Sequence, residues 1–272
     1  MLHLMLLYRA KIAAFQLQRR MAKPPSERKI RADGRIATLT KEHVGECRTR
    51  TLSFHDTVRA RQSCRSFSPT PVDPAQIREV LDDARWTPSN CNTQPWQVHI
   101  VSGAKRDEMA QALLGAASTG KLSLDFSFDD KLFDGRYGER RREHGALYYS
   151  SLGVARDDTE GRRIASGRNF TFFGAPHVAF LLMPSFGDNV RVAGDIVMFG
   201  QTFLLALAAR GLGGVPQTVL GYFADTVREC LGVPDTMKLL FGISFGHPAE
   251  DTHLTQVRTG RDEVDSFTKF HQ

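Results

Sequence analysis

Apolar residues recur at helical spacing in three stretches in the first half of the chain, at about 52–63, 74–86 and 104–116. This spacing predicts three amphipathic helices. Ser53 stands at the start of the first stretch, and Asp73 stands just before the second. Their side-chain oxygens suit them as N-caps, because they can accept hydrogen bonds from backbone N–H groups that a helix start leaves unpaired.

Continuous apolar runs bounded by Pro or Gly predict strands at about 96–101, 176–183 and 239–246. Between the second and third runs lies the most apolar stretch, 195–214, which has apolar side chains on nearly every face. We expect a helix here that is central or at a subunit interface, ended by its glycines. A Gly- and Pro-bounded loop at 215–222 and another amphipathic helix should follow.

Residues 118–168 break this regularity, because Phe and Tyr are mixed with dense charge. One interpretation is a lid or insertion over a pocket, since mobile aromatic and charged segments often serve that role. The alternative is one or two solvent-facing helices. Their inner face would carry Leu147, Tyr148, Leu152 and Val154. His144 is either an acid–base group or an ordinary polar residue, and we favour the latter.

The charge of the chain is concentrated in its first fifty residues. The net charge is +6 over 272 residues, but residues 1–50 hold twelve Lys or Arg and four acids, so they carry +8 and the remainder −2. A basic, Pro- and Gly-punctuated composition predicts a flexible arm over 1–51 and an ordered domain over 52–272. Because the body is not basic, we expect no nucleic-acid partner.

The apolar start, MLHLMLLY, is too short to cross a bilayer, so we expect no stable membrane insertion. A surface-binding helix and a transit-like segment are alternatives, but we favour translation beginning at Met21. The four cysteines form no C-x-x-C pair and have no His at ligand spacing. This excludes an obvious zinc site or disulfide framework and fits a reducing, cytoplasmic location.

Two polar clusters suggest a binding site. Arg61 and Arg65 bracket Ser63, and the forked donors of Arg match phosphate oxygens. About twenty-five residues later, a Pro-bounded loop holds more amides and hydroxyls than a turn needs: Ser89, Asn90, Asn92, Thr93 and Gln94. The alternative is that both clusters are only structural, a helix entry followed by a loop that caps a strand. No Rossmann glycine motif, P-loop, H-E-x-x-H or Ser/His/Asp set is visible.

These two clusters, RQSCRSF (61–67) and WTPSNCNTQPWQ (86–97), resemble the signature of the nitroreductase family of FMN-dependent flavoproteins. The segments GDIVMFGQTFLLALAARGLGGVPQ, NFTFFGAP and RTGRDEVDSF are similar to the same family, so the resemblance covers about 54–270. It implies an α+β, three-layer fold with a mixed, mainly antiparallel sheet flanked by helices. It also implies an intertwined homodimer with two FMN sites at the interface.

The resemblance also implies roles for particular residues. The phosphate and ribityl chain of FMN would be bound by Arg61, Gln62, Ser63, Arg65, Arg258 and Arg261. The flavin ring or ribityl chain would be contacted from the partner subunit by Pro88, Ser89 and Asn92. Backbone amides near the N5/O4 edge of the ring would come from Pro216, Gln217 and Thr218. Two residues depart from the common family pattern. Gln62 stands where the family often has Arg or His, and Cys91 stands where Gly or another small residue is commoner.

The implied activity is transfer of reducing equivalents from NAD(P)H, through FMN, to a small-molecule acceptor such as a nitroaromatic or a quinone. The cofactor performs the redox chemistry, so we expect neither a catalytic side chain nor a metal. Two alternatives stay open: reduction of an enone or halogenated aromatic on the same fold, and a flavin-binding protein without turnover.

Overall fold

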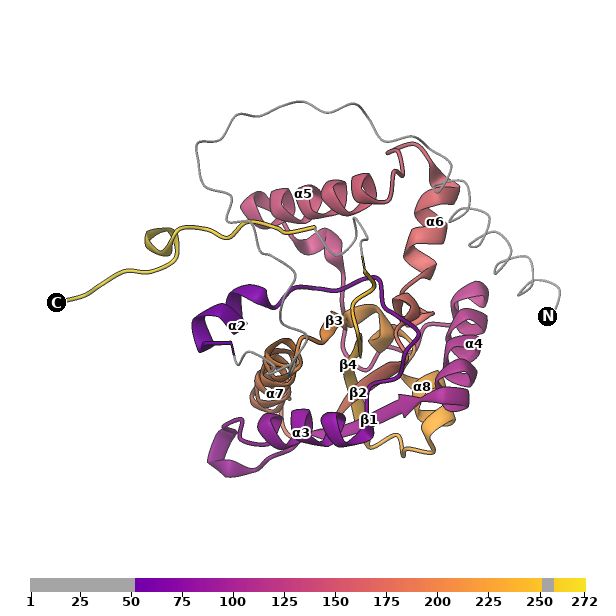
Figure 1. Cartoon of the computed structure of the whole chain (residues 1–272), viewed down its shortest axis with the longest axis horizontal. Coiled ribbons are helices and arrows are strands. Elements are labelled where there is room, and N and C mark those ends of the chain that lie inside the picture. Colours follow the sequence, from indigo (N-terminus) through magenta and orange to yellow (C-terminus); the bar gives the residue numbers. More distant parts are fainter. Residues whose placement is uncertain (1–51, 251–256) are drawn as a thin grey trace, which may run out of the picture. The chain divides into compact units, whose positions relative to one another are not determined.

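The computed structural model describes residues 52–250 and 257–272, so the predicted basic arm lies outside the described residues. Figure 1 shows the arrangement of the elements. The helices are α2 (Phe54–Ala60), α3 (Pro74–Ala84), α4 (Gly103–Thr119), α5 (Gly135–Ser151), α6 (Thr159–Gly167), α7 (Val190–Ala209) and α8 (Ala224–Leu231). The strands are β1 (Gln97–Ser102), β2 (His177–Pro184), β3 (Gly213–Gln217) and β4 (Met237–Gly246).

The two predicted N-caps are confirmed. The Ser53 hydroxyl accepts from the backbone N–H of Asp56 at 3.1 Å, at the start of α2. The Asp73 carboxylate accepts from the N–H of Ala75 at 2.8 Å, and Pro74 occupies the first turn of α3, where its missing N–H costs nothing. Local side-chain chemistry therefore fixes both helix starts.

The strands form one sheet in the order β1-β2-β4-β3, and neighbouring strands pair antiparallel. Among the described residues, parallel pairing appears only in two isolated bridges, Ser123 with Phe223 and Ser63 with Gly214, where the arginine-bearing segment runs beside β3. The prediction of a buried strand at 96–101 is partly wrong. In β1 only Val101 is buried, because this strand lies at the edge of the sheet.

The sheet separates two apolar cores, because successive side chains of a strand point to opposite faces. On β2, Val178, Phe180 and Leu182 face the core under α4 and α8. The alternate β2 residues face the core under α3 and α7, with which Ile196 and Phe203 of α7 also pack. These layers, helix on sheet on helix, give the three-layer α+β fold that the resemblance implies.

The predicted central helix is confirmed as α7, but it begins at Val190, five residues early, and ends at Ala209. Gly213 and Gly214 do not end it as expected; they begin β3, in a stretch we expected to be partly loop. By length and apolar composition, α7 could either span a membrane or be a buried core helix, because both kinds of helix have these properties. Its eight buried residues and its packing on the sheet show the latter role.

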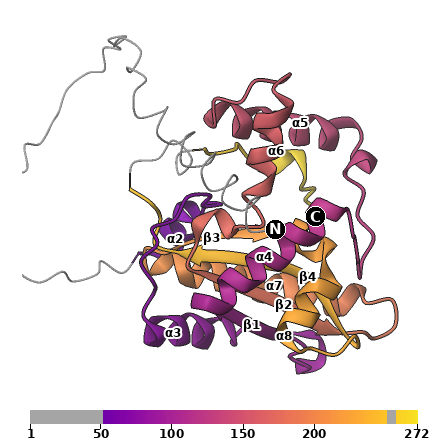
Figure 2. The same ribbon diagram turned by 90° about the vertical axis from the view of Figure 1, so that its right-hand side faces the viewer.

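Segment 118–168 contains two α-helices of its own, α5 and α6, which both views place beyond the β3 edge of the sheet, away from α3 (Figures 1 and 2). Leu152, Val154 and Ala165 form a small core of their own, against which Tyr148 packs. Leu147, expected on the inner face, is 49% exposed. The small size of this core leaves much of α5 in contact with solvent.

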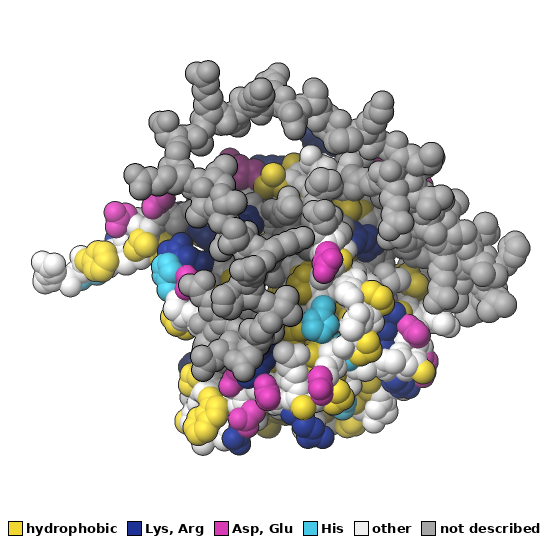
Figure 3. All heavy atoms as spheres, viewed as in Figure 1, with side chains coloured by type: hydrophobic (Ala, Val, Ile, Leu, Met, Phe, Trp, Pro, Cys, Tyr) yellow, Lys and Arg dark blue, Asp and Glu magenta, His cyan; other side chains and the backbone are white. Residues whose placement is uncertain are grey.

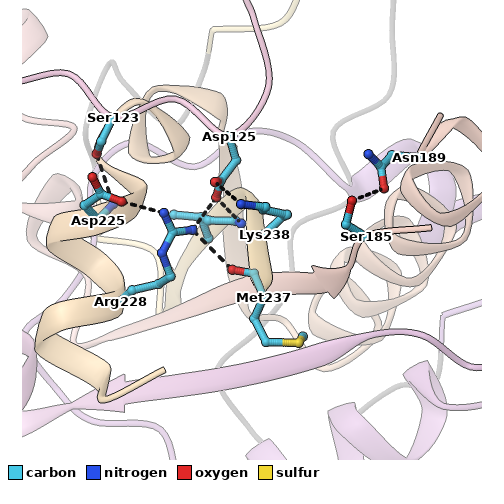
Figure 4. A network of polar contacts seen from close by, with 9 residues as sticks. Ser123, Asp125, Ser185, Asn189, Asp225, Arg228, Met237 and Lys238 are labelled. Carbon is cyan, nitrogen blue, oxygen red and sulfur yellow. Dashed lines mark hydrogen bonds and ion pairs between the residues drawn. The ribbon is translucent and has the colours of Figure 1, made fainter. Parts of the chain in front are cut away.

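A buried ion network clamps the segment before α5 onto the domain (Figure 4). Arg228 on α8 donates to Asp125 at 2.5 Å and to Asp225 at 2.6 Å. Asp125 also accepts from the N–H of Leu239 at 2.8 Å and pairs with Lys238 at 3.4 Å. Burial alone would lower the pKa of Arg228. The hydrogen bonds and charges of Asp125 and Asp225 together raise it by a larger amount, so the net shift is upward.

We expect Asp125→Ala to lower the free energy of unfolding by about 3–5 kcal/mol, because it leaves the buried guanidinium of Arg228 without its main partner. Asp225→Ala is a matched control, since it removes the other carboxylate from the same arginine. The Asp225 side chain is 52% exposed, against 5% for Asp125, so its loss should cost about 1 kcal/mol or less. Denaturant titration measures both values, and equal losses would contradict this account.

A buried histidine joins the chain before α3 to the sheet. Nε2 of His177 accepts from the N–H of Val72 at 2.9 Å, so the ring proton is on Nδ1, which lies 2.5 Å from the Ser102 hydroxyl. Burial lowers the pKa of His177, and His247 lowers it further. Protonation would place a second N–H against the N–H of Val72, so the folded state requires the neutral ring.

Because the folded-state pKa of His177 lies below its unfolded value of about 6.5, the stabilisation is complete above that pH and is lost as the pH falls below it. We expect the free energy of unfolding to fall by up to about 1.4 kcal/mol per pH unit from this group. His177→Gln can still accept from Val72 but does not titrate. Denaturant titrations between pH 7 and 5 should therefore show a smaller slope for this variant.

Candidate functional site

A cavity of about 930 Å³ opens where α2, the segment that follows it, α5, α7 and the C-terminal segment meet. Its lining includes six of the predicted site residues: Arg61, Gln62, Ser63, Arg65, Arg258 and Arg261. The structure thus brings together residues from opposite ends of the described chain. Figure 3 shows Lys and Arg side chains gathered beside the C-terminal segment.

The cavity is strongly cationic. Among the described residues its lining holds five arginines, the four predicted ones and Arg59, and no Asp or Glu. Burial lowers the pKa of Arg61, and the nearby charges of Arg261 and Arg258 lower it further. Crowded like charges without an acidic partner destabilise a folded chain, so this arrangement favours binding of an anion.

Backbone contacts hold the arginines in place. Arg258 donates to the carbonyl of Arg59 at 2.7 Å, which ties the C-terminal segment to the end of α2. Arg61 itself is the C-cap of α2. A helix C-terminus carries partial negative charge, so the guanidinium groups must supply all of the attraction for an anion here.

Glycines in β3 let the arginine segment lie flat against the sheet. A Cβ on Gly213 would stand 2.8 Å from the Cβ of Cys64, and a Cβ on Gly214 would stand 2.8 Å from Cδ2 of Leu204 in α7. The N–H of Cys64 donates to the carbonyl of Gly214 at 3.2 Å. Cys64 is buried, and burial raises the pKa of its thiol, which agrees with a packing role.

Gln62 lines the cavity, and its side chain carries an unsatisfied polar atom. Its side-chain oxygen Oε1 is buried and has no hydrogen-bond partner among the described residues. A buried acceptor without a donor is costly, so a ligand that donates a hydrogen bond at this point would be favoured. A hydroxyl group has the required chemistry.

Arg65 is held by two residues of α5, one helical turn apart. Its guanidinium lies 5.1 Å from the centre of the Tyr148 ring, and its Nη2 lies 3.5 Å from Nε2 of His144. Burial lowers the pKa of Arg65, and Arg168 lowers it further. Burial and Arg65 also lower the pKa of His144, which keeps its imidazole neutral at neutral pH.

The predicted polar loop lies outside this cavity. Ser89 and Asn92 belong to a tight turn in which the Ser89 hydroxyl accepts from the N–H of Gln94 at 2.9 Å. The Asn92 side-chain oxygen accepts from Nε2 of Gln94 at 3.1 Å. Pro88 and Asn92 are exposed, and none of the three predicted residues of this loop lines the cavity.

The residues at the end of β3 also lie outside the cavity lining. The Gln217 side chain is buried, donates to Asn169 at 3.0 Å and accepts from Ser244. Thr218 is exposed. Pro216 has no backbone N–H, so our expectation that it provides an amide donor is wrong on chemical grounds. Only Gln217 and Thr218 can provide donors here.

A model of the Nitroreductase family matches residues 58–247. The chain belongs to the nitroreductase family. Nitroreductase NfnB of Mycolicibacterium smegmatis is 40% identical over 213 residues, which cover 78% of this chain and 90% of that protein. A 4-nitrobenzoate reductase of Pseudomonas putida is 32% identical over 222 residues, which cover 81% of this chain and 96% of that protein.

Solved structures agree with this assignment. The FMN-dependent nitroreductase NfnB from Mycobacterium smegmatis, crystallised in complex with NADPH, has a TM-score of 0.77 at 39% identity. The match covers 80% of this chain and 97% of that one. The FMN- and NADPH-dependent nitroreductase NfnB from sphigopyxis sp. strain HMH has a TM-score of 0.78 at 29% identity. The match covers 81% of this chain and 100% of that one.

Several residues that line the cavity of this nitroreductase are not among the predicted site residues. His144, which we expected to be an ordinary polar residue, is exposed and lines the cavity, as do His55 and Gln201. Arg59 could have been found, because it is two residues from Arg61 on the same chain segment. His144 could not, since only the packing of α5 brings it to Arg65 across 79 residues of sequence.

Proposed function

We propose that the protein is an FMN-dependent oxidoreductase that passes reducing equivalents from NADPH to electron-poor acceptors, nitroaromatics above all. The observation that carries the proposal is the arginine-lined cavity, with no acid among its described lining, in a chain of the nitroreductase family. NADPH is preferred as donor because the solved relatives depend on it, and nitroaromatics because a relative reduces 4-nitrobenzoate.

The cavity fits the phosphate end of FMN. Arg61, Arg258 and Arg261 would bind the phosphate, whose charge offsets their mutual repulsion. Ser63 would donate its hydroxyl to a phosphate oxygen. The buried Oε1 of Gln62 would accept from a hydroxyl of the ribityl chain, and Arg65 would lie beside the chain.

The ring end would be completed by a second subunit in a homodimer. Gln201 lines the cavity, whereas the next residue, Thr202, bonds to Thr87 before the polar loop at 2.8 Å. Successive helix residues point about 100° apart, so the loop and the cavity lie on different sides of α7. We infer that Pro88, Ser89 and Asn92 meet the flavin of the partner.

Exposed apolar side chains support such an interface. Phe54 and Val58 of α2, and Val197 and Met198 of α7, are all exposed although α2 and α7 contact each other. Contiguous exposed apolar residues often mark a protein interface. Phe267 and Phe270, near the chain end, are also exposed, as expected of a segment that packs on a partner.

Bound FMN would supply two-electron transfer between the nicotinamide and the acceptor. The chain would bind and orient the cofactor, with backbone N–H groups of Gln217 and Thr218 directed at the N5/O4 edge. Residues 118–168 would serve as a lid, since α5 contributes His144 to the cavity wall. Three described cysteines are free, which supports a cytoplasmic location.

We expect Arg261→Gln to raise the Kd for FMN about tenfold or more while leaving the Kd for riboflavin unchanged, because only FMN carries the phosphate. Fluorescence titration of the flavin-free protein measures both constants. Arg85→Gln is the control, since Arg85 is an exposed arginine that pairs with Asp82. Equal weakening of both flavins would remove Arg261 from the phosphate site.

The proposed activity is tested with purified full-length protein, which should be yellow and should lose its flavin absorbance when NADPH is added without oxygen. A nitroaromatic such as 4-nitrobenzoate should restore the absorbance and give steady turnover. Much faster turnover with an enone or a halogenated aromatic would assign a different acceptor. Bound flavin that NADPH does not reduce would indicate a binding protein, and failure to bind flavin would refute the proposal.

A further inference from the structure

A buried carboxylate on α7 contacts the polar loop rather than a cation. The Asp195 residue is 4% exposed, and its two oxygens lie 3.1 and 3.2 Å from the backbone N–H of Asn90, which they share. Asp195 forms no ion pair within residues 52–250 and 257–272. Buried carboxylates are usually paired with cations, so a single backbone N–H is an unusual partner and points to a specific role.

The loop that Asp195 holds has a strained backbone. Cys91, Asn92 and Gln94 have φ values of 51°, 54° and 47°, in the left-handed region that favours glycine. Three such residues within four positions persist only where the surroundings impose them, and this kind of strain gathers at ligand-binding sites. The internal bonds of the turn, from Gln94 to Ser89 and Asn92, set its shape but attach it to nothing.

Two residues of α7 attach the loop to the domain. Asp195 binds its first turn, and Thr202, seven residues later on the same helix face, bonds to Thr87 just before it. Thr87 and Thr202 hold the entry to the loop. Among the described residues outside the loop, Asp195 alone bonds to the turn that contains the strained residues, because Asn90 is the first residue of that turn.

We infer that Asp195 is a positioning residue: by accepting from the N–H of Asn90, it fixes the loop 88–94 in the conformation that presents Ser89 and Asn92 to the ring end of the flavin. This role rests on the proposed FMN-dependent function. The positioning role explains why a buried carboxylate is present at this point of α7, where it forms no ion pair in the described chain.

The fixed loop leaves defined donors free for a ligand. The Ser89 oxygen already accepts from Gln94, so its hydroxyl hydrogen can donate outward. The Asn92 oxygen also accepts from Gln94, so its amide N–H₂ remains as donor. Both groups would donate to carbonyl oxygens or ring nitrogens, which are the acceptors that a flavin ring offers.

The first test measures the loop without flavin. In the flavin-free full chain, Asp195→Ala should raise hydrogen exchange of the backbone amides of residues 89–94 about tenfold or more, because a hydrogen bond to a charged group is lost. Asp195→Asn keeps an acceptor oxygen and should restore most of the protection. Unchanged exchange in Asp195→Ala would overturn the inference, whatever the fate of the proposed function.

The second test measures the consequence with FMN bound. Asp195→Ala should change the visible absorption and circular dichroism of the flavin and lower kcat about tenfold, with Asp195→Asn close to wild type. Asp125→Asn is the control for simple destabilisation, since Asp125 is a buried carboxylate that bonds to Arg228, on α8. It should lower Tm without altering the flavin spectrum.

These outcomes separate the two claims. If wild-type protein binds no FMN, the proposed function fails, and the exchange measurement still decides whether Asp195 holds the loop. If FMN binds and is reduced normally but Asp195→Ala leaves spectrum and kcat at wild-type values, the proposed function stands and the positioning role is refuted. Loss of kcat in Asp125→Asn equal to that in Asp195→Ala would also refute it, by showing that stability alone is responsible.

Discussion

The close approach permitted by Gly213 and Gly214 is the constraint on which the rest of the structure depends. One glycine leaves room for the chain at Cys64, and the next leaves room for Leu204 and Leu207 of α7. The helix and the arginine segment thereby pack directly on the backbone of the edge strand at these two glycines, through the side chains of Leu204, Leu207 and Cys64. Since α7 also holds the polar loop through Asp195 and Thr202, this packing sets the geometry of both parts of the site.

The arginine cavity stores electrostatic strain that a bound anion would relieve. Arg61, Arg258 and Arg261 lie close enough to lower the pKa of Arg61, and no described carboxylate lines the cavity to offset them. Folding brings these like charges together because apolar packing elsewhere outweighs their repulsion. A site of this kind sacrifices some stability of the free protein for affinity toward a dianion such as a phosphate.

Two buried carboxylates show how similar burial serves different ends. Asp125 satisfies an arginine, a lysine and a backbone N–H, so its network joins three segments of chain. Asp195 has one backbone N–H as its partner in the described structure, and that N–H begins a strained loop. The first arrangement is expected of a structural clamp, and the second of a residue that positions a binding loop.

The sequence by itself determined the elements whose cause is local. Ser53 and Asp73 start helices through their own side chains, the apolar run 195–214 predicts a central helix, and the spacing of Arg61, Ser63 and Arg65 predicts a phosphate site. The family motifs added Arg258 and Arg261, which the structure places in the same cavity. Such features are readable because each depends on residues a few positions apart or on a motif.

Only the tertiary structure decided which distant residues meet. It placed His144 beside Arg65, moved β1 to the edge of the sheet, made a strand of Gly213–Gln217 and attached the loop to Asp195. It also directed Gln217 inward and exposed Leu147. No local pattern encodes these outcomes, because each depends on how helices and strands far apart in sequence pack to exclude water, and that packing is a property of the whole domain.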